Sequence, residues 1–201
     1  MNVSLTRNLR PIERRFVVLA ALVLLPVFFL PVLPIWTMKL WAPQYREGLT
    51  LTIYTNTIRG NLDTINRLNH YVGMHDISAD QFREFSYLPQ ALSLFGLFAL
   101  IAALVNRRWF AILGWLGFTG FAIYMFWDFG SWLWHYGHDL DPRAALKLPA
   151  FTPPVIGFEQ MANFKVLSLP GSGTVLLGIA WLLGPLTLWL ERRDAGARRR
   201  G

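Results

Sequence analysis

The sequence predicts an all-α membrane protein, with four transmembrane helices and two extracytoplasmic loops that form a small cap with little β structure. Three observations predict this fold class. Apolar residues gather in four runs, each about as long as the 20 residues that cross a bilayer. Hydrophobic residues make up 54% of the 201 residues and charged residues only 15%, whereas soluble domains carry about 25% charged residues. Basic residues gather in three segments beside the runs.

The first apolar run, residues 16–36, follows a basic tail at residues 1–15. Its length suits a membrane span. Pro26, Pro31 and Pro34 predict a kinked outer half, because proline interrupts the helical hydrogen bonds. The small-residue cleavage pattern of a signal peptide is missing, so we expect an uncleaved anchor.

The second and third runs, residues 88–105 and 109–129, are separated only by a short turn at residues 106–108. Such a short connection predicts an antiparallel helical hairpin. The fourth run, residues 173–190, is followed by a second basic tail at residues 191–201.

The charge distribution predicts the orientation of these helices. The two tails and the turn hold eleven of the 19 Lys and Arg residues, but only three of the 12 Asp and Glu residues. Basic segments stay on the cytoplasmic side, and four spans place all three segments there. We therefore expect a multi-pass protein of the bacterial inner (cytoplasmic) membrane with both termini cytoplasmic. Because topology accounts for the net charge of +7, we expect the lipid bilayer and not a nucleic acid as its partner.

The remaining residues form two periplasmic loops, at residues 37–87 and 130–172, which are too long to be simple connections. We expect them to pack against each other. Alternating polarity at residues 49–54 predicts a short strand. Short helices are expected at residues 63–68 and 158–164, and Ser78 with Gln81 predicts another helix start.

The histidines are the main candidates for chemistry. All four lie in the loops, in two close pairs, with a methionine and acidic residues beside them. Imidazole and thioether groups suit copper, whereas zinc would need only histidine and aspartate. The chain has no cysteine, so such a site would exchange its metal readily. The predicted metal ligands are His70, Met74, His75, His135, His138 and Asp139.

Other chemistries find no support in the motifs. The chain lacks a nucleophile elbow, a phosphate-binding glycine loop and a haem-attachment motif, so we predict no catalytic residues. The apolar runs are almost free of ionisable residues, with Asp128 as the main exception. This argues against a transporter or a proton pump with a site at the membrane midplane.

Several stretches in both loops resemble a known family. Residues 41–49 and 65–74, together with residues 136–142, 153–157 and 163–164, are similar to bacterial four-span membrane proteins that accompany nitrous-oxide reductase accessory and copper-handling proteins. The resemblance implies a role in copper handling. His70, Met74 and His138 fit the family pattern, whereas Arg46 stands where proline is expected and His75 is an additional histidine.

The sequence therefore predicts an inner-membrane accessory protein rather than an enzyme. It would present a periplasmic His/Met copper site to a copper chaperone, or for delivery to, or maturation of, a copper enzyme such as nitrous-oxide reductase. One alternative is a metal-free scaffold subunit that docks a periplasmic partner. Another is a small metal-dependent membrane oxidase that uses Asp128, His135 and His138.

Overall fold

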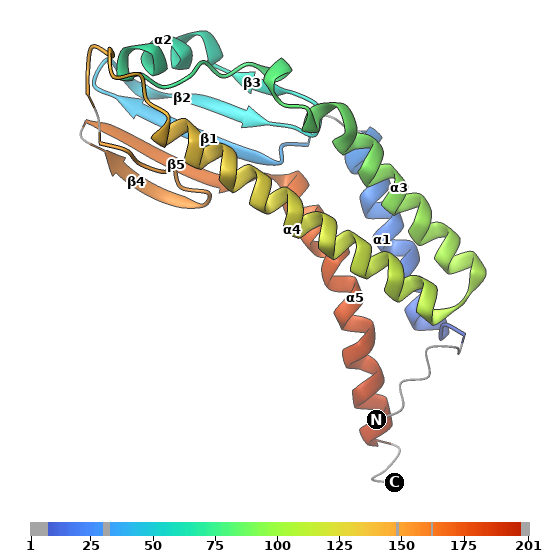
Figure 1. Ribbon diagram of the computed structural model, residues 1–201. Coiled ribbons are helices and arrows are strands. Elements are labelled where there is room, and N and C mark those ends of the chain that lie inside the picture. Colours follow the sequence, from blue (N-terminus) through green and yellow to red (C-terminus); the bar gives the residue numbers. More distant parts are fainter. Residues whose placement is uncertain (1–7, 30–32, 148, 162, 198–201) are drawn as a thin grey trace. The chain divides into compact units, whose positions relative to one another are not determined.

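The computed structural model describes residues 8–29, 33–147, 149–161 and 163–197, and divides the chain into two compact units (Figure 1). The helical unit comprises Met1–Leu30, Pro89–Ala122 and Val175–Gly201, and the sheet unit comprises Pro31–Leu88 and Ile123–Thr174.

Four long helices supply the helical unit, and three of them, α3, α4 and the first residues of α5, also contribute to the sheet unit. The helices are α1 (Pro11–Phe29), α3 (Glu84–Val105), α4 (Arg108–His138) and α5 (Ser172–Ala197). The sheet unit adds α2 (Leu62–Val72), a short 3₁₀ turn η1 (Ala79–Gln81) and the strands β1 (Trp36–Ala42), β2 (Tyr45–Ile53), β3 (Ile58–Gly60), β4 (Gly157–Met161) and β5 (Phe164–Pro170).

The five strands form one antiparallel sheet in the order β3-β2-β1-β5-β4 (Figure 1). Its centre joins the two predicted loops, because β1 pairs with β5 in a register that sets Trp36 opposite Pro170. The prediction of an all-α protein with little β structure is therefore wrong, and the chain has a mixed α/β fold. The expected association of the two loops takes the form of this strand pairing.

One face of the sheet carries the core of the sheet unit. Leu49 and Leu51 are buried at alternate positions of β2, as the period of a strand requires. From α2, Ile65 and Leu68 pack into the same cluster, and Leu133 enters it from the last turns of α4. This packing holds α2 and the end of α4 against the sheet.

The local predictions in the loops have mixed outcomes. The strand expected at residues 49–54 lies in β2 except for Tyr54, which follows it, and the helix expected at residues 63–68 is part of α2. The helix start at Ser78 is only a 3₁₀ turn. The helix expected at residues 158–164 is wrong, because Gly157–Met161 folds back on β5 as β4 and finds its hydrogen bonds there.

Two of the described helices, α3 and α4, are long and apolar enough to cross a membrane. The expected four spans are thus not what the structure supports. In α1 the first turns contain Glu13, Arg14 and Arg15, and a shorter apolar stretch of α5 covers Ser172–Leu186. The first predicted span is also wrong at its outer end, because Trp36 already belongs to β1.

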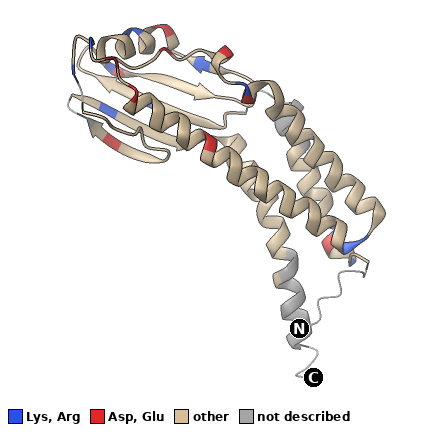
Figure 2. Ribbon diagram, viewed as in Figure 1, with Lys and Arg blue, Asp and Glu red and all other residues tan. Residues whose placement is uncertain are grey.

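Charged side chains are sparse along α3 and α4 (Figure 2). Between its terminal residues, α4 contains a single acidic or basic residue other than histidine, Asp128. In the most apolar 18-residue stretch of α4, only 6% of the residues are buried within the protein. A core helix of a soluble protein would be mostly buried, and this stretch is mostly exposed.

Candidate functional site

The residues that follow α2 are held in place by two asparagines on that helix. Gly73 ends α2 in the left-handed conformation with φ 82°. Asn69 Nδ2 donates to the carbonyl oxygen of His75 at 3.2 Å, and Asn66 exchanges hydrogen bonds with both backbone groups of Ile77 at 2.8 and 3.0 Å. These contacts determine the position of His75.

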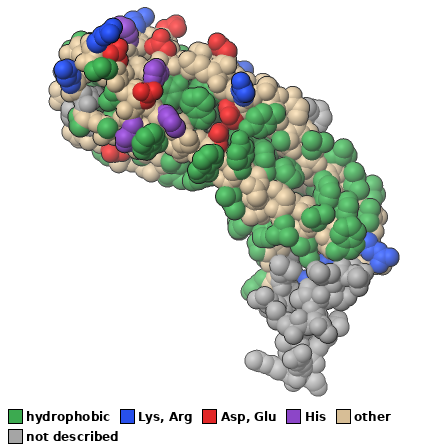
Figure 3. Space-filling view, in the orientation of Figure 1, with side chains coloured by type: hydrophobic (Ala, Val, Ile, Leu, Met, Phe, Trp, Pro, Cys, Tyr) green, Lys and Arg blue, Asp and Glu red, His purple; other side chains and the backbone are tan. Residues whose placement is uncertain are grey.

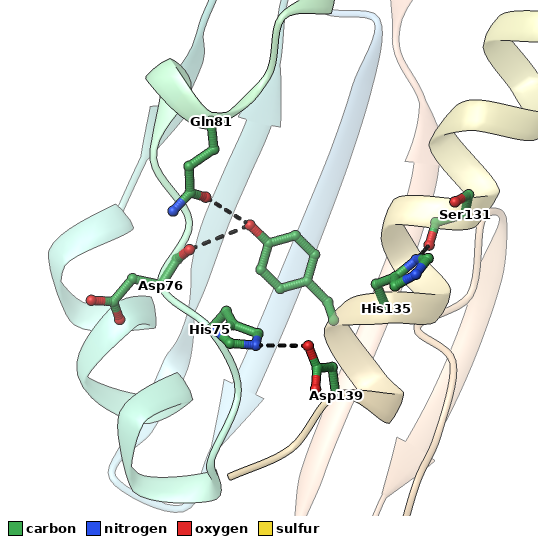
Figure 4. A network of polar contacts seen from close by, with 7 residues as sticks. His75, Asp76, Gln81, Ser131, His135 and Asp139 are labelled. Carbon is green, nitrogen blue, oxygen red and sulfur yellow. Dashed lines mark hydrogen bonds and ion pairs between the residues drawn. The ribbon is translucent and has the colours of Figure 1, made fainter.

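The last turns of α4 are tied to the same segment. The buried Tyr136 donates its hydroxyl to the carbonyl oxygen of Asp76 at 3.3 Å and to Gln81 Oε1 at 3.1 Å (Figure 4). Nearby, the rings of Phe82 and Trp132 lie with their centroids 4.7 Å apart. A side chain of α4 therefore bridges to the segment that carries His75.

This arrangement brings His75 and Asp139 together, although they are 64 positions apart in the chain. His75 Nε2 lies 3.1 Å from Asp139 Oδ2 (Figure 4). Both side chains are well exposed, at 65% and 74%. Water and an ion can therefore reach the pair directly.

The two histidines at the end of α4 share a different arrangement. His135 Nδ1 lies 2.7 Å from the carbonyl oxygen of Ser131, and His138 Nδ1 lies 2.9 Å from that of Trp134. The His138 ring stacks on Trp134 at a centroid distance of 4.3 Å. A carbonyl can only accept, so Nδ1 carries the proton in each case and the lone pair of a neutral ring is on Nε2.

The remaining predicted ligands are separate from this pair in their contacts. His70 lies on the exposed side of α2, and Met74 is half-buried just after the helix. Histidine side chains nevertheless gather on one face of the sheet unit (Figure 3). Among the described residues, no group of three or more His, Asp or Glu side chains is placed to hold a metal ion.

Sequence reasoning included His75 and Asp139 among six candidate ligands, but it did not predict that these two meet, and it missed the residues that position them. Tyr136, Asn66 and Asn69 were not predicted to act in the site. A signal existed for the asparagines, because polar residues three positions apart on an amphipathic helix share one side of it. The contact of Tyr136 with Gln81 spans 55 positions and has no local signal.

A substitution of Gly73 tests whether the end of α2 positions the segment that carries His75. Its left-handed backbone costs a residue with a side chain about 1–2 kcal/mol, and an added Cβ would lie 2.8 Å from both the Ala144 Cβ and the Asp141 carbonyl oxygen. We expect Gly73→Ala to lower the free energy of unfolding by about 2 kcal/mol or more. Urea unfolding of the purified full-length protein, followed by tryptophan fluorescence, measures it.

The matched control is Gly130→Ala in α4, where an added Cβ meets nothing within 4 Å. Alanine is the better helix former, so this change should leave stability unchanged or raise it by up to about 1 kcal/mol. Equal stability of the two variants would contradict the described end of α2.

Comparison with protein-family models, curated proteins and solved structures found no match for this chain. The proposed function therefore depends on the geometry of the site and on the resemblance seen in the loop sequences.

Proposed function

We propose that this chain is a membrane-anchored accessory protein that presents copper, as cargo, on the histidine face of its sheet unit. The observation that carries the proposal is the exposed pair of His75 and Asp139. The resemblance noted above suggests a periplasmic copper enzyme, such as nitrous-oxide reductase, as the recipient.

The distance between His75 Nε2 and Asp139 Oδ2 is suitable for two ligands of one metal ion. Two donor atoms at bonds of about 2 Å from a first-row metal lie about 2.9–3.4 Å apart, and the observed separation is 3.1 Å. A cation can replace the hydrogen bond between these side chains without moving them far. The imidazole would accept either oxidation state of copper, and the carboxylate would favour Cu(II).

His135 and His138 are suited to join as further ligands. Hydrogen bonds from Nδ1 to a backbone carbonyl fix the tautomer of many metal-binding histidines and present Nε2 to the ion. Both histidines make such a bond. Among the described residues, no third ligand is assembled beside the pair. The site we propose is therefore an open and exchangeable one, which suits delivery of the metal.

Copper binding tests the proposal. Full-length protein in detergent is titrated with Cu(I) and Cu(II) against a competing chelator, and we expect one copper per chain. His75→Ala with Asp139→Asn should weaken binding at least about tenfold, because each lost ligand removes more than the 1.4 kcal/mol that a factor of ten represents. Undiminished binding in this double variant, or no copper in either oxidation state, would contradict the site.

Asp141→Asn is the matched control, since Asp141 is an exposed carboxylate two residues away that accepts from the backbone N–H of Arg143 at 2.8 Å. Its removal should leave copper affinity unchanged. His70→Ala and Met74→Ala then show whether the ligands from the end of α2 take part.

A metal-free docking role is the second candidate, and one observation favours it. Tyr71 and Trp134 are 51% and 49% exposed on the sheet unit, and exposed aromatic residues are enriched where proteins bind each other. Protein that binds no copper, but loses its partner on Trp134→Ala, would support this function instead.

We also propose that the helical unit lies in the bacterial inner membrane. The apolar, mostly exposed surfaces of α3 and α4 support this location. The start of α1 lies beside the α3–α4 turn, because Leu9 N donates to the Asn106 carbonyl oxygen at 3.2 Å. Arg14, Arg15 and Arg107 are therefore at one end of the unit, and the preference for basic residues on the cytoplasmic side orients this end inward.

A further inference from the structure

A hollow of about 650 Å³ lies at the basic end of the helical unit. It forms where the start of α1 meets the α3–α4 turn. The wall between them is held by the Leu9–Asn106 hydrogen bond and by an isolated β-bridge between Asn8 and Arg107. The hollow is lined by Leu9, Pro11, Arg14, Arg15, Val18, Leu19 and Asn106.

The lining combines cations with an apolar surface. Arg14 and Arg15 are exposed, and their planar guanidinium groups suit the paired oxygens of a phosphate. Further along α1, Leu19 and Leu22 are 46% and 54% exposed. Because residues three or four positions apart share one side of a helix, Arg15, Leu19 and Leu22 form a continuous strip from charged to apolar.

Asn106 contributes a third feature. It has a left-handed backbone with φ 57°, a conformation that asparagine tolerates better than most residues. Its side-chain Oδ1 is buried and has no hydrogen-bond partner among the described residues. A buried acceptor without a donor is unfavourable, and a hydroxyl group bound in the hollow would supply the donor.

We propose that this hollow binds an anionic phospholipid with a hydroxylated headgroup, of the phosphatidylglycerol class. Arg14 and Arg15 contact the phosphate, Asn106 accepts from a headgroup hydroxyl, and an acyl chain follows Leu19 and Leu22. Basic pockets between helices at the cytoplasmic side of a membrane bind such headgroups. The inference rests on the proposed membrane location and is independent of the copper site.

Lipid titration of the full-length protein in detergent, read by native mass spectrometry, tests the inference. Phosphatidylglycerol should bind about tenfold or more tightly than phosphatidylcholine with the same acyl chains. Arg14→Gln with Arg15→Gln should remove most of this preference. Arg14→Lys with Arg15→Lys keeps the charge that orients the protein, and should retain part of it.

The control pair Arg46→Gln with Arg143→Gln removes the same charge from the exposed surface of the sheet unit and should leave the preference intact. An equal loss in this control, or no preference in the unchanged protein, would overturn the inference. Displacement of the lipid by millimolar inorganic phosphate would also overturn it, because a simple anion site needs no apolar strip.

An alkaline carbonate wash separates this failure from a failure of the proposed location. If the protein stays in the membrane fraction but shows no lipid preference, only the lipid site is wrong. If the wash releases the protein, the membrane location itself is wrong.

Discussion

Replacing Trp36 by alanine is expected to lower the free energy of unfolding of the sheet unit by about 3–5 kcal/mol, the usual cost of removing a buried tryptophan. Trp36 is only 6% exposed and lies in the central strand β1. Its Nε1 donates to the Val155 carbonyl oxygen at 2.7 Å, and its ring meets Phe129 edge-on at 5.1 Å. The alanine variant loses both contacts and leaves a cavity between the sheet and α4.

Urea unfolding in detergent measures the effect of Trp36→Ala, with Trp134→Ala as the matched control. Trp134 is 49% exposed, so its removal should cost less than about 1 kcal/mol. Trp36→Phe should lie between the two, because it keeps an aromatic ring and loses the hydrogen bond. Similar stabilities of Trp36→Ala and Trp134→Ala would contradict the placement of β1 at the centre of the sheet.

An acidic residue in the apolar first half of α4 should reduce membrane insertion. Leu116 is 54% exposed in the protein, so a change there disturbs little internal packing. If lipid surrounds it, Leu116→Asp costs about 2.5–3.5 kcal/mol in the insertion of that helix. We expect the amount of the variant that resists carbonate extraction to fall severalfold or more.

Leu116→Ala is the control for size, and it should remain in the membrane at nearly the normal level. A normal membrane level of Leu116→Asp would contradict a lipid-facing α4. The variant Arg83→Asp tests whether any added negative charge has the same effect. Arg83 is exposed in the segment just before α3. We expect no loss there.

The helices that depend on local hydropathy could be predicted well. Residues 88–105 and 109–129 lie within α3 and α4, because long apolar runs separated by a three-residue break have few other stable forms. A short helix was also predicted at residues 63–68, which lie within α2, where Ile65, Leu68 and Val72 are buried. The structure extends α4 to His138, well beyond the end expected for the span.

The central strands could not be predicted in the same way. β1 follows closely on an apolar run, and Trp36 was therefore assigned to a membrane span. Its neighbour β5 begins more than 120 positions later, so no local pattern indicates their pairing. Phe158 and its neighbours form β4 only because β5 offers hydrogen bonds to them.

By itself, the sequence determined the apolar helices and their basic flanking segments, and it singled out the histidines as candidate metal ligands. Composition and spacing along the chain are enough for these features. Only the tertiary structure decided that the two loops build one sheet and that His75 meets Asp139, while His70 is left on the outer side of α2. Contacts between distant segments depend on strand register and core packing, and neither of these is encoded in any short stretch of the chain.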